Sequence, residues 1–167
     1  MSTQRKLGHG RYHDEMPVGF GFETMGRTLT ETDLVTYINL TWFTEEVFVN
    51  THDRAGHALP SRVVPGSLVY AFAEGLVAPS LQFTGLAFLG TEIDIRQPTT
   101  VGDTIHVRVE VIESRLASRG ARGLVRTRNE VINQRGETVL VYTPLRLVAT
   151  RPADTAAPLP PAPAPHR

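Results

Sequence analysis

Acidic and imidazole side chains gather in residues 41–61, a stretch without a steady hydrophobic period. Glu45 and Glu46 stand side by side there, and His52 and Asp53 follow a few residues later. Carboxylates and imidazoles are the side chains that most often transfer protons in catalysis. A loop that brings them together would hold an acid–base pair. A loop on the surface would instead leave two glutamates in a solvated turn, with His52 and Asp53 on its exterior.

The same stretch carries three aromatic residues, Trp42, Phe43 and Phe48. Two interpretations stay open for them. The rings could pack as an ordinary aromatic cluster of the core, or they could form the wall of an apolar binding tunnel.

Gly66 begins an apolar segment that ends near Ala78. Its large residues form a broad stripe with small residues between them, and Pro65 comes just before it, which predicts a buried helix. The stripe consists of Leu68, Val69, Phe72, Leu76 and Val77. The first amides of a helix lack intrahelical partners and carry partial positive charge, so they can hold an oxygen of a ligand. Alternatively, Gly66 only allows the helix to pack closely on a sheet.

Other segments must position these residues. Thr30 and Asp33 have the spacing of a capping box, which predicts a helix over residues 31–40. Alternating apolar and polar residues predict long antiparallel strands in 93–96, 105–111, 124–133 and 138–149, with one more strand around 19–26. The fold class is therefore α+β, with an antiparallel sheet wrapped around one central buried helix.

Composition limits the function. The chain has 167 residues, no Cys, and 17 basic against 17 acidic side chains, so we expect one domain over residues 17–150 without thiolate metal sites, nucleic-acid binding or membrane binding. Residues 1–16 are expected to be flexible, and the Pro- and Ala-rich residues 151–167 to be a disordered tail. The histidines lack metal-ligand spacing, and no phosphate-binding or dinucleotide motif is present. We expect no metal, no cofactor and a cytoplasmic location.

Three strings, in this order of elements, carry a resemblance to a known family. They are Gly-Arg-Thr-Leu-Thr-Glu-Thr-Asp (26–33), Arg-Val-Val-Pro-Gly-Ser-Leu (62–68) and Ile-Arg-Gln-Pro-Thr-Thr-Val-Gly-Asp (95–103). Residues 17–150 thereby resemble the hot-dog fold of the MaoC-like family, whose best known members are R-specific enoyl-CoA hydratases. The resemblance implies a hydratase or dehydratase of 2-enoyl or 3-hydroxyacyl thioesters. It also implies a homodimer, or a heterodimer with another hot-dog subunit, that binds acyl-CoA at the interface.

The family's hydratases carry an Asp-x-Asn-Pro-x-His signature after the first helix, and this chain departs from it. The family's spacing places Phe43 at the Asp position and Phe48 at the His position. Glu45, Glu46, His52 and Asp53 are then the substitutes within reach. The resemblance further implies that Gly66 and Ser67 contact the thioester, and that Arg96 contacts the phosphates of coenzyme A.

Two other functions remain open. Trp42, Phe43 and Phe48 could make the tunnel too dry and narrow for hydration, which would leave a catalytically silent subunit that shapes the tunnel of an active partner. A hot-dog thioesterase would instead use a carboxylate near the buried helix, and Glu74 is the only carboxylate within that helix. Alternatively, Glu74 completes a hydrogen-bond network at the interface.

Overall fold

A computed structural model describes residues 6–52, 62–118 and 120–152, and its main layer is an antiparallel sheet. The long strands β7 (Thr104–Leu116) and β8 (Arg122–Asn133) pair at its centre. Shorter strands complete both sides. Along β7 lie β1 (Gly21–Glu23) and β2 (Arg27–Thr28); along β8 lie β9 (Thr138–Tyr142) and β10 (Leu145–Ala149); and outside these lie β4 (Gly85–Gly90) and β5 (Ile93–Ile95).

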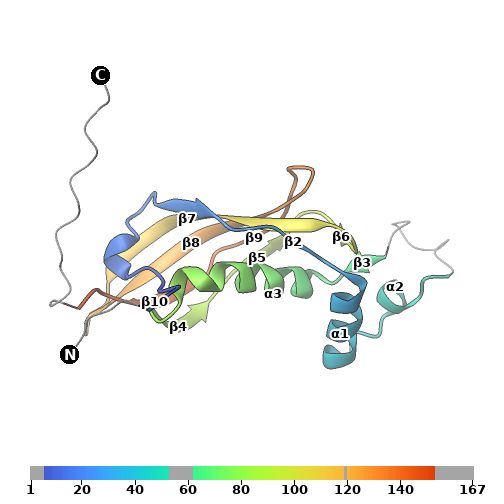
Figure 1. Cartoon of the computed structure of the whole chain (residues 1–167), viewed down its shortest axis with the longest axis horizontal. Coiled ribbons are helices and arrows are strands. Elements are labelled where there is room, and N and C mark those ends of the chain that lie inside the picture. The colour runs from blue at the N-terminus through green and yellow to red at the C-terminus, as the bar shows by residue number, and fades with distance from the viewer. Residues whose placement is uncertain (1–5, 53–61, 119, 153–167) are drawn as a thin grey trace, which may run out of the picture.

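The helix α3 (Gly66–Val77) covers one face of this sheet (Figure 1). Its buried side chains are Leu68, Val69, Ala73 and Val77. They pack in one cluster with Ile105, Val107 and Val109 of β7, which are buried, and the residues between these three are more exposed. A half-buried strand has this period of two. The structure therefore confirms the alternation predicted from the sequence, with the apolar face of β7 turned toward the helix.

The helix α1 (Glu31–Thr41) lies with the short α2 (Glu46–Val49) at one end of the molecule (Figure 1). The Thr30 hydroxyl accepts a hydrogen bond from the Asp33 amide, and the Asp33 carboxylate accepts one from the Thr30 amide. This reciprocal cap satisfies two amides that the helix itself leaves unpaired. The two-stranded sheet of β3 (Val63–Val64) and β6 (Thr99–Thr100) lies at the same end and leads into α3.

The predicted α+β architecture, an antiparallel sheet wrapped around one central helix, is confirmed, with several local differences. The single strand expected over residues 138–149 is two strands, because Pro144 has no amide hydrogen to continue the ladder. The strand β4 was not predicted. Its sequence, Gly-Leu-Ala-Phe-Leu-Gly, has no polar alternation, and it follows α3 after only the short 3-10 helix η2 (Ala78–Leu81).

The N-terminal segment differs from the flexible tail expected over residues 1–16, because residues 6–16 pack on the body of the fold. The amides of Gly10 and Arg11 donate to the carbonyls of Gln82 and Ser80, both at 2.8 Å. The 3-10 helix η1 (His13–Glu15) follows, and Met16 is buried in a small second cluster of the core. Sequence reasoning missed this packing because the partners of the segment, such as Ser80 and Gln82, lie far away along the chain.

Arg151, which the sequence placed in the C-terminal tail, is also part of the fold. Its amide donates to Asp14 Oδ1 at 2.9 Å, and its guanidinium contacts Glu15 Oε1 at 2.5 Å. The N-terminal and C-terminal parts of the described chain therefore contact each other at η1. The rest of the expected tail, residues 153–167, lies outside the described residues.

Candidate functional site

Most of the predicted site residues lie at the end of the molecule where α1, α2 and the beginning of α3 meet (Figure 1). Arg62 links these elements. Its Nε donates to the carbonyl of Phe48 at 2.7 Å, and its guanidinium forms an ion pair with Glu31. This side chain holds the loop after α1 against the strand that leads to Gly66.

Two of the three predicted aromatic residues meet. The ring centroids of Phe43 and Phe48 are 5.7 Å apart, and Tyr37 of α1 is 6.1 Å from Phe43. Phe48 packs against the main core. Trp42 does not join them: it ends α1 in the left-handed conformation, with φ of 60°, and is 84% exposed. The pair Phe43–Phe48 therefore forms an apolar edge beside the loop, and Trp42 faces solvent in the single chain.

The predicted proton-transfer residues are not brought together among the described residues. Glu45 precedes α2, and the carboxylate of Glu46 accepts a hydrogen bond from Asn50 Nδ2 at 2.7 Å. The backbone amide of His52 donates to Asn50 Oδ1 at 2.8 Å. All three predicted side chains are exposed, and Asp53 lies outside the described residues.

Gly66 occupies a position that only a glycine fits without movement. A Cβ added there would lie 2.3 Å from Ile95 Cδ1. Beside it is a small pocket of about 40 Å³, with Val69, Ile95 and Gln97 among its walls. The amides of Leu68 and Val69 both donate to the carbonyl of Pro65. The first turn of α3 thus opens beside a narrow apolar pocket, and Ser67 is exposed next to it.

Arg96 follows β5 near this pocket, since Ile95 and Gln97 on either side line it. Its Nε contacts Asp94 Oδ2 at 2.9 Å, and both side chains are largely exposed. Such an exposed pair contributes little stability. The guanidinium stays accessible to an anionic ligand, although Asp94 offsets part of its charge.

Glu74, the carboxylate considered for a thioesterase, is already bound. Both its oxygens accept hydrogen bonds from Arg146 Nη2, at 2.6 and 2.7 Å. Charge-assisted bonds of this kind are among the strongest in proteins. A carboxylate held in this way is a poor nucleophile, so this contact disfavours the thioesterase alternative.

The Glu74–Arg146 pair belongs to a polar cluster beneath α3 that sequence reasoning missed. Tyr142 and Asn129 face each other across β9 and β8, and both are fully buried. Burial raises the pKa of the Tyr142 hydroxyl, and the negative charge of Glu74 raises it further. The sequence did contain a sign of this cluster. Thr127 and Asn129 alternate along β8 in step with Val125 and Val131, so these two polar side chains must point to the same buried face.

Two further findings limit the site. No helix in the described ranges is long and apolar enough to cross a membrane. Within those same ranges, no group of three or more potential metal-ligating side chains comes together.

The chain matches the model of the FAS1-like dehydratase domain region over residues 17–141. It is 36% identical over 103 residues to the mesaconyl-CoA hydratase of Cereibacter sphaeroides, a match that spans 61% of this chain but only 29% of that relative.

Two solved structures are similar over most of this chain. The monoamine oxidase regulatory protein of Archaeoglobus superposes with a TM-score of 0.78 at 28% identity, covering 86% of this chain and 97% of that one. A protein described as a MaoC domain dehydratase from Chloroflexus aurantiacus gives a TM-score of 0.83 at 25% identity, covering 98% of this chain and 46% of that one.

These matches define the class of protein. The family model covers most of the chain, and the sheet and its central helix superpose on MaoC-like structures. The chain belongs to the FAS1-like dehydratase region family and is a MaoC-like hot-dog protein. The positions assigned to Phe43 and Phe48 in the family's signature stay a prediction.

Proposed function

We propose that this protein is an acyl-thioester hydratase or dehydratase that acts on a 2-enoyl or 3-hydroxyacyl thioester. The main support for this proposal is the start of α3. Gly66, the first residue of this helix, lines the same pocket as Ile95 and Gln97, so the first backbone amides of the helix lie beside that pocket. Amides placed there can hold the thioester oxygen as it becomes an enolate. The name of the Cereibacter sphaeroides relative, a mesaconyl-CoA hydratase, supports the same class of substrate.

In the proposed hydration, a base removes a proton from water, and the resulting hydroxide adds to the β carbon of the enoyl thioester. The electrons move to the thioester oxygen, and an acid then delivers a proton to the α carbon. No cofactor enters this balance, and its absence stays a prediction. Glu45, Glu46, His52 and Asp53 are the proposed acid and base, because all four lie within ten residues of Phe43 in the sequence.

Hydration of crotonyl-CoA and mesaconyl-CoA by the purified chain tests this function. We expect slow turnover by the chain alone, because Glu45, Glu46 and His52 are exposed in the single chain. Glu46→Gln or His52→Ala should reduce the rate by about 10²-fold or more if either residue transfers a proton. Glu110→Gln, an exposed glutamate on β7, is the matched control.

A second function is supported by the contact between Phe43 and Phe48, because the family's spacing predicts that these two residues occupy the positions of its acid and base. In that case the chain is a silent subunit. It would show no turnover alone and would restore activity to a hot-dog partner that carries the Asp and His. Absence of turnover in both experiments, together with no acyl-CoA binding, would refute the proposed class of substrate.

We also propose that the chain works as a dimer, paired along β4. The long strands β7 and β8 are not available for such pairing, because they have neighbours on both sides. β4 lies at the edge of the sheet, and its residues Leu86, Phe88 and Leu89 are about half exposed. An apolar edge strand is a ready surface for pairing with another chain.

Sedimentation at micromolar concentration should therefore give twice the 18.4 kDa mass of the chain. Phe88→Lys should yield monomers, whereas Leu116→Lys, at the exposed end of β7, should not. A wild-type monomer at high concentration would contradict this interface. The cytoplasmic location expected from the sequence stays a prediction.

A further inference from the structure

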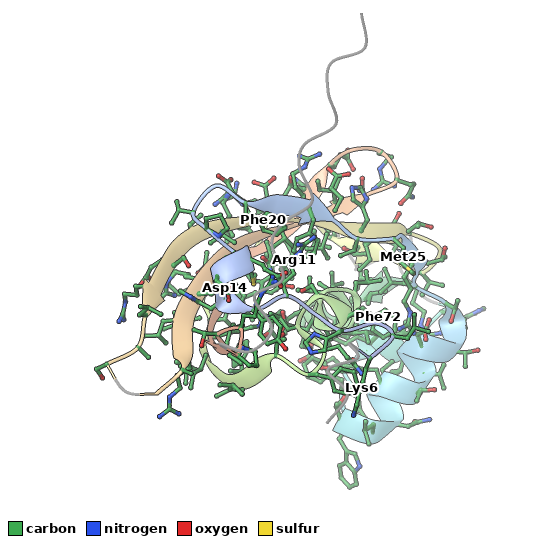
Figure 2. The ribbon with its side chains drawn as sticks, turned by 60° about the vertical axis from the view of Figure 1, so that its left-hand side comes forward. Lys6, Arg11, Asp14, Phe20, Met25 and Phe72 are labelled. Atoms are coloured by element: carbon green, nitrogen blue, oxygen red, sulfur yellow. The ribbon has the colours of Figure 1, made fainter. Side chains whose placement is uncertain are left out.

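A hollow of about 750 Å³ lies between the N-terminal segment and the C-terminal half of α3. Figure 2 looks onto this end of the molecule, with Lys6, Arg11 and Phe72 around the end of α3. Phe22, Leu76 and Pro79 provide apolar walls, and Lys6, His9 and Arg11 bring basic side chains. Ligand pockets commonly have volumes of this size and combine apolar walls with a few polar groups.

The charges around this hollow are unbalanced. Neither Lys6 nor Arg11 has a carboxylate partner among the described residues, and both cations lie over aromatic rings instead. Lys6 Nζ is 4.9 Å from the ring centre of Phe83, and the Arg11 guanidinium is 4.5 Å from that of Phe20. Of the described residues that line the hollow, Glu15 is acidic, and its carboxylate already binds the Tyr12 amide and Arg151. The hollow therefore favours an anion.

The backbone fixes the segment that carries these cations. Besides the two hydrogen bonds to Gln82 and Ser80, Gly10 lies so close to η2 that an added Cβ would be 2.5 Å from the amide nitrogen of Gln82. Farther along, the ring of His13 covers Gly123 and lies 3.1 Å from Ser114 Oγ. Arg11 thus lies on a segment anchored on both sides of Tyr12, and the carbonyl of Lys6 accepts a hydrogen bond from the His9 amide at 3.1 Å. This order lowers the entropy that a ligand must remove on binding.

We propose that this hollow binds a small amphipathic organic anion. Its phosphate or carboxylate would lie within reach of Lys6 and Arg11, and its apolar body would rest on Phe22, Leu76 and Pro79. The hollow is separate from the proposed reaction site, because Leu76 is ten residues along α3 from Gly66, which corresponds to about 15 Å of helix.

An NMR titration with two probes tests the proposal and distinguishes a phosphate ligand from a carboxylate ligand. Adenosine monophosphate represents a phosphate on an aromatic body, and octanoate represents a carboxylate on an acyl chain. We expect at least one probe to shift the amides of Gly8, Gly10 and Ser80 in a saturable way. If neither probe moves these amides, or if shifts occur only at Gly66 and Ser67, the proposal is wrong.

Charge variants provide the second measurement. Lys6→Gln and Arg11→Gln should each weaken binding by about tenfold, since a hydrogen bond to a charged group is lost. The control is Arg115→Gln, which removes an equally exposed cation from the end of β7 and should leave the affinity unchanged. Equal binding by wild type and the Lys6→Gln/Arg11→Gln double variant would overturn the proposal. The result is independent of enzymatic activity, so failure of the proposed function would not affect it.

Discussion

The ion pair between Glu74 and Arg146 allows a quantitative test of the polar cluster beneath α3. Only 11% of the Arg146 side chain and 25% of the Glu74 side chain are exposed. Removing one partner of a buried pair leaves the other charge without compensation, which typically costs 3–5 kcal/mol. Because Glu74 retains some access to water, we expect Glu74→Gln and Arg146→Met each to cost about 3 kcal/mol, at the lower end of this range.

The double variant should be far less destabilised than the sum of the two single changes. With both charges gone, no bare charge remains, and an apolar replacement of a buried pair is often nearly neutral. We expect a loss of about 1–2 kcal/mol for Glu74→Gln/Arg146→Met, and hence a coupling energy of about 4–5 kcal/mol.

Urea unfolding of the four proteins, with midpoints and slopes compared, measures these values. Equal slopes would show that the variants lose stability without a change in the surface exposed on unfolding. Losses below about 1 kcal/mol for both single variants, or additive losses in the double variant, would refute the reasoning that this pair is desolvated.

Three further measurements test other buried or ion-paired side chains of the fold. The raised pKa of Tyr142 stabilises the fold below about pH 10 and its effect is lost as the pH rises further, so Tyr142→Phe should flatten the alkaline loss of stability in unfolding scans. Burial raises the pKa of Asp103, but bonds from Thr100, Gln134 and Arg135 outweigh it and lower the pKa overall, so stability should fall below about pH 4, and less steeply in Asp103→Asn. A chain that ends at Thr150 lacks the contacts of Arg151 with η1 and should unfold about 1 kcal/mol more easily than one that ends at Pro152, a difference that calorimetry can detect. Equal stability of the two truncated chains would mean that Arg151 contributes nothing.

The sequence predicted the elements whose signal is local. The capping box at Thr30, the apolar stripe after Gly66 and the alternation in residues 105–111 each lie within one segment and are each confirmed. The order of these elements also predicted a sheet wrapped around a central helix, and the resemblance to the MaoC-like family implied the hot-dog fold. The spacing of apolar residues in each segment indicates which of its faces is buried in the core, and this spacing can be read without knowing the rest of the fold.

Features that depend on distant partners could not be predicted in this way. Nothing in residues 6–16 alone indicates that Gly10 contacts Gln82, or that His13 covers Gly123, since both contacts depend on the tertiary fold. The sequence around Arg146 is that of an ordinary strand, and its ion pair with Glu74 depends on how α3 packs on the sheet. The acid and base are harder still, because three of their four candidates are exposed and the fourth lies outside the described residues.

The position of Trp42 has a practical consequence, because it is the only tryptophan of the chain. Its indole ring is already 84% exposed in the folded single chain. Unfolding therefore changes its surroundings little, and its fluorescence emission should shift only slightly in denaturant. A shift to shorter wavelength in native buffer would instead report that a second subunit, an acyl thioester or the neighbouring loop has covered the end of α1. The protein thus carries its own optical probe at the end of the molecule where the acyl-thioester site is proposed.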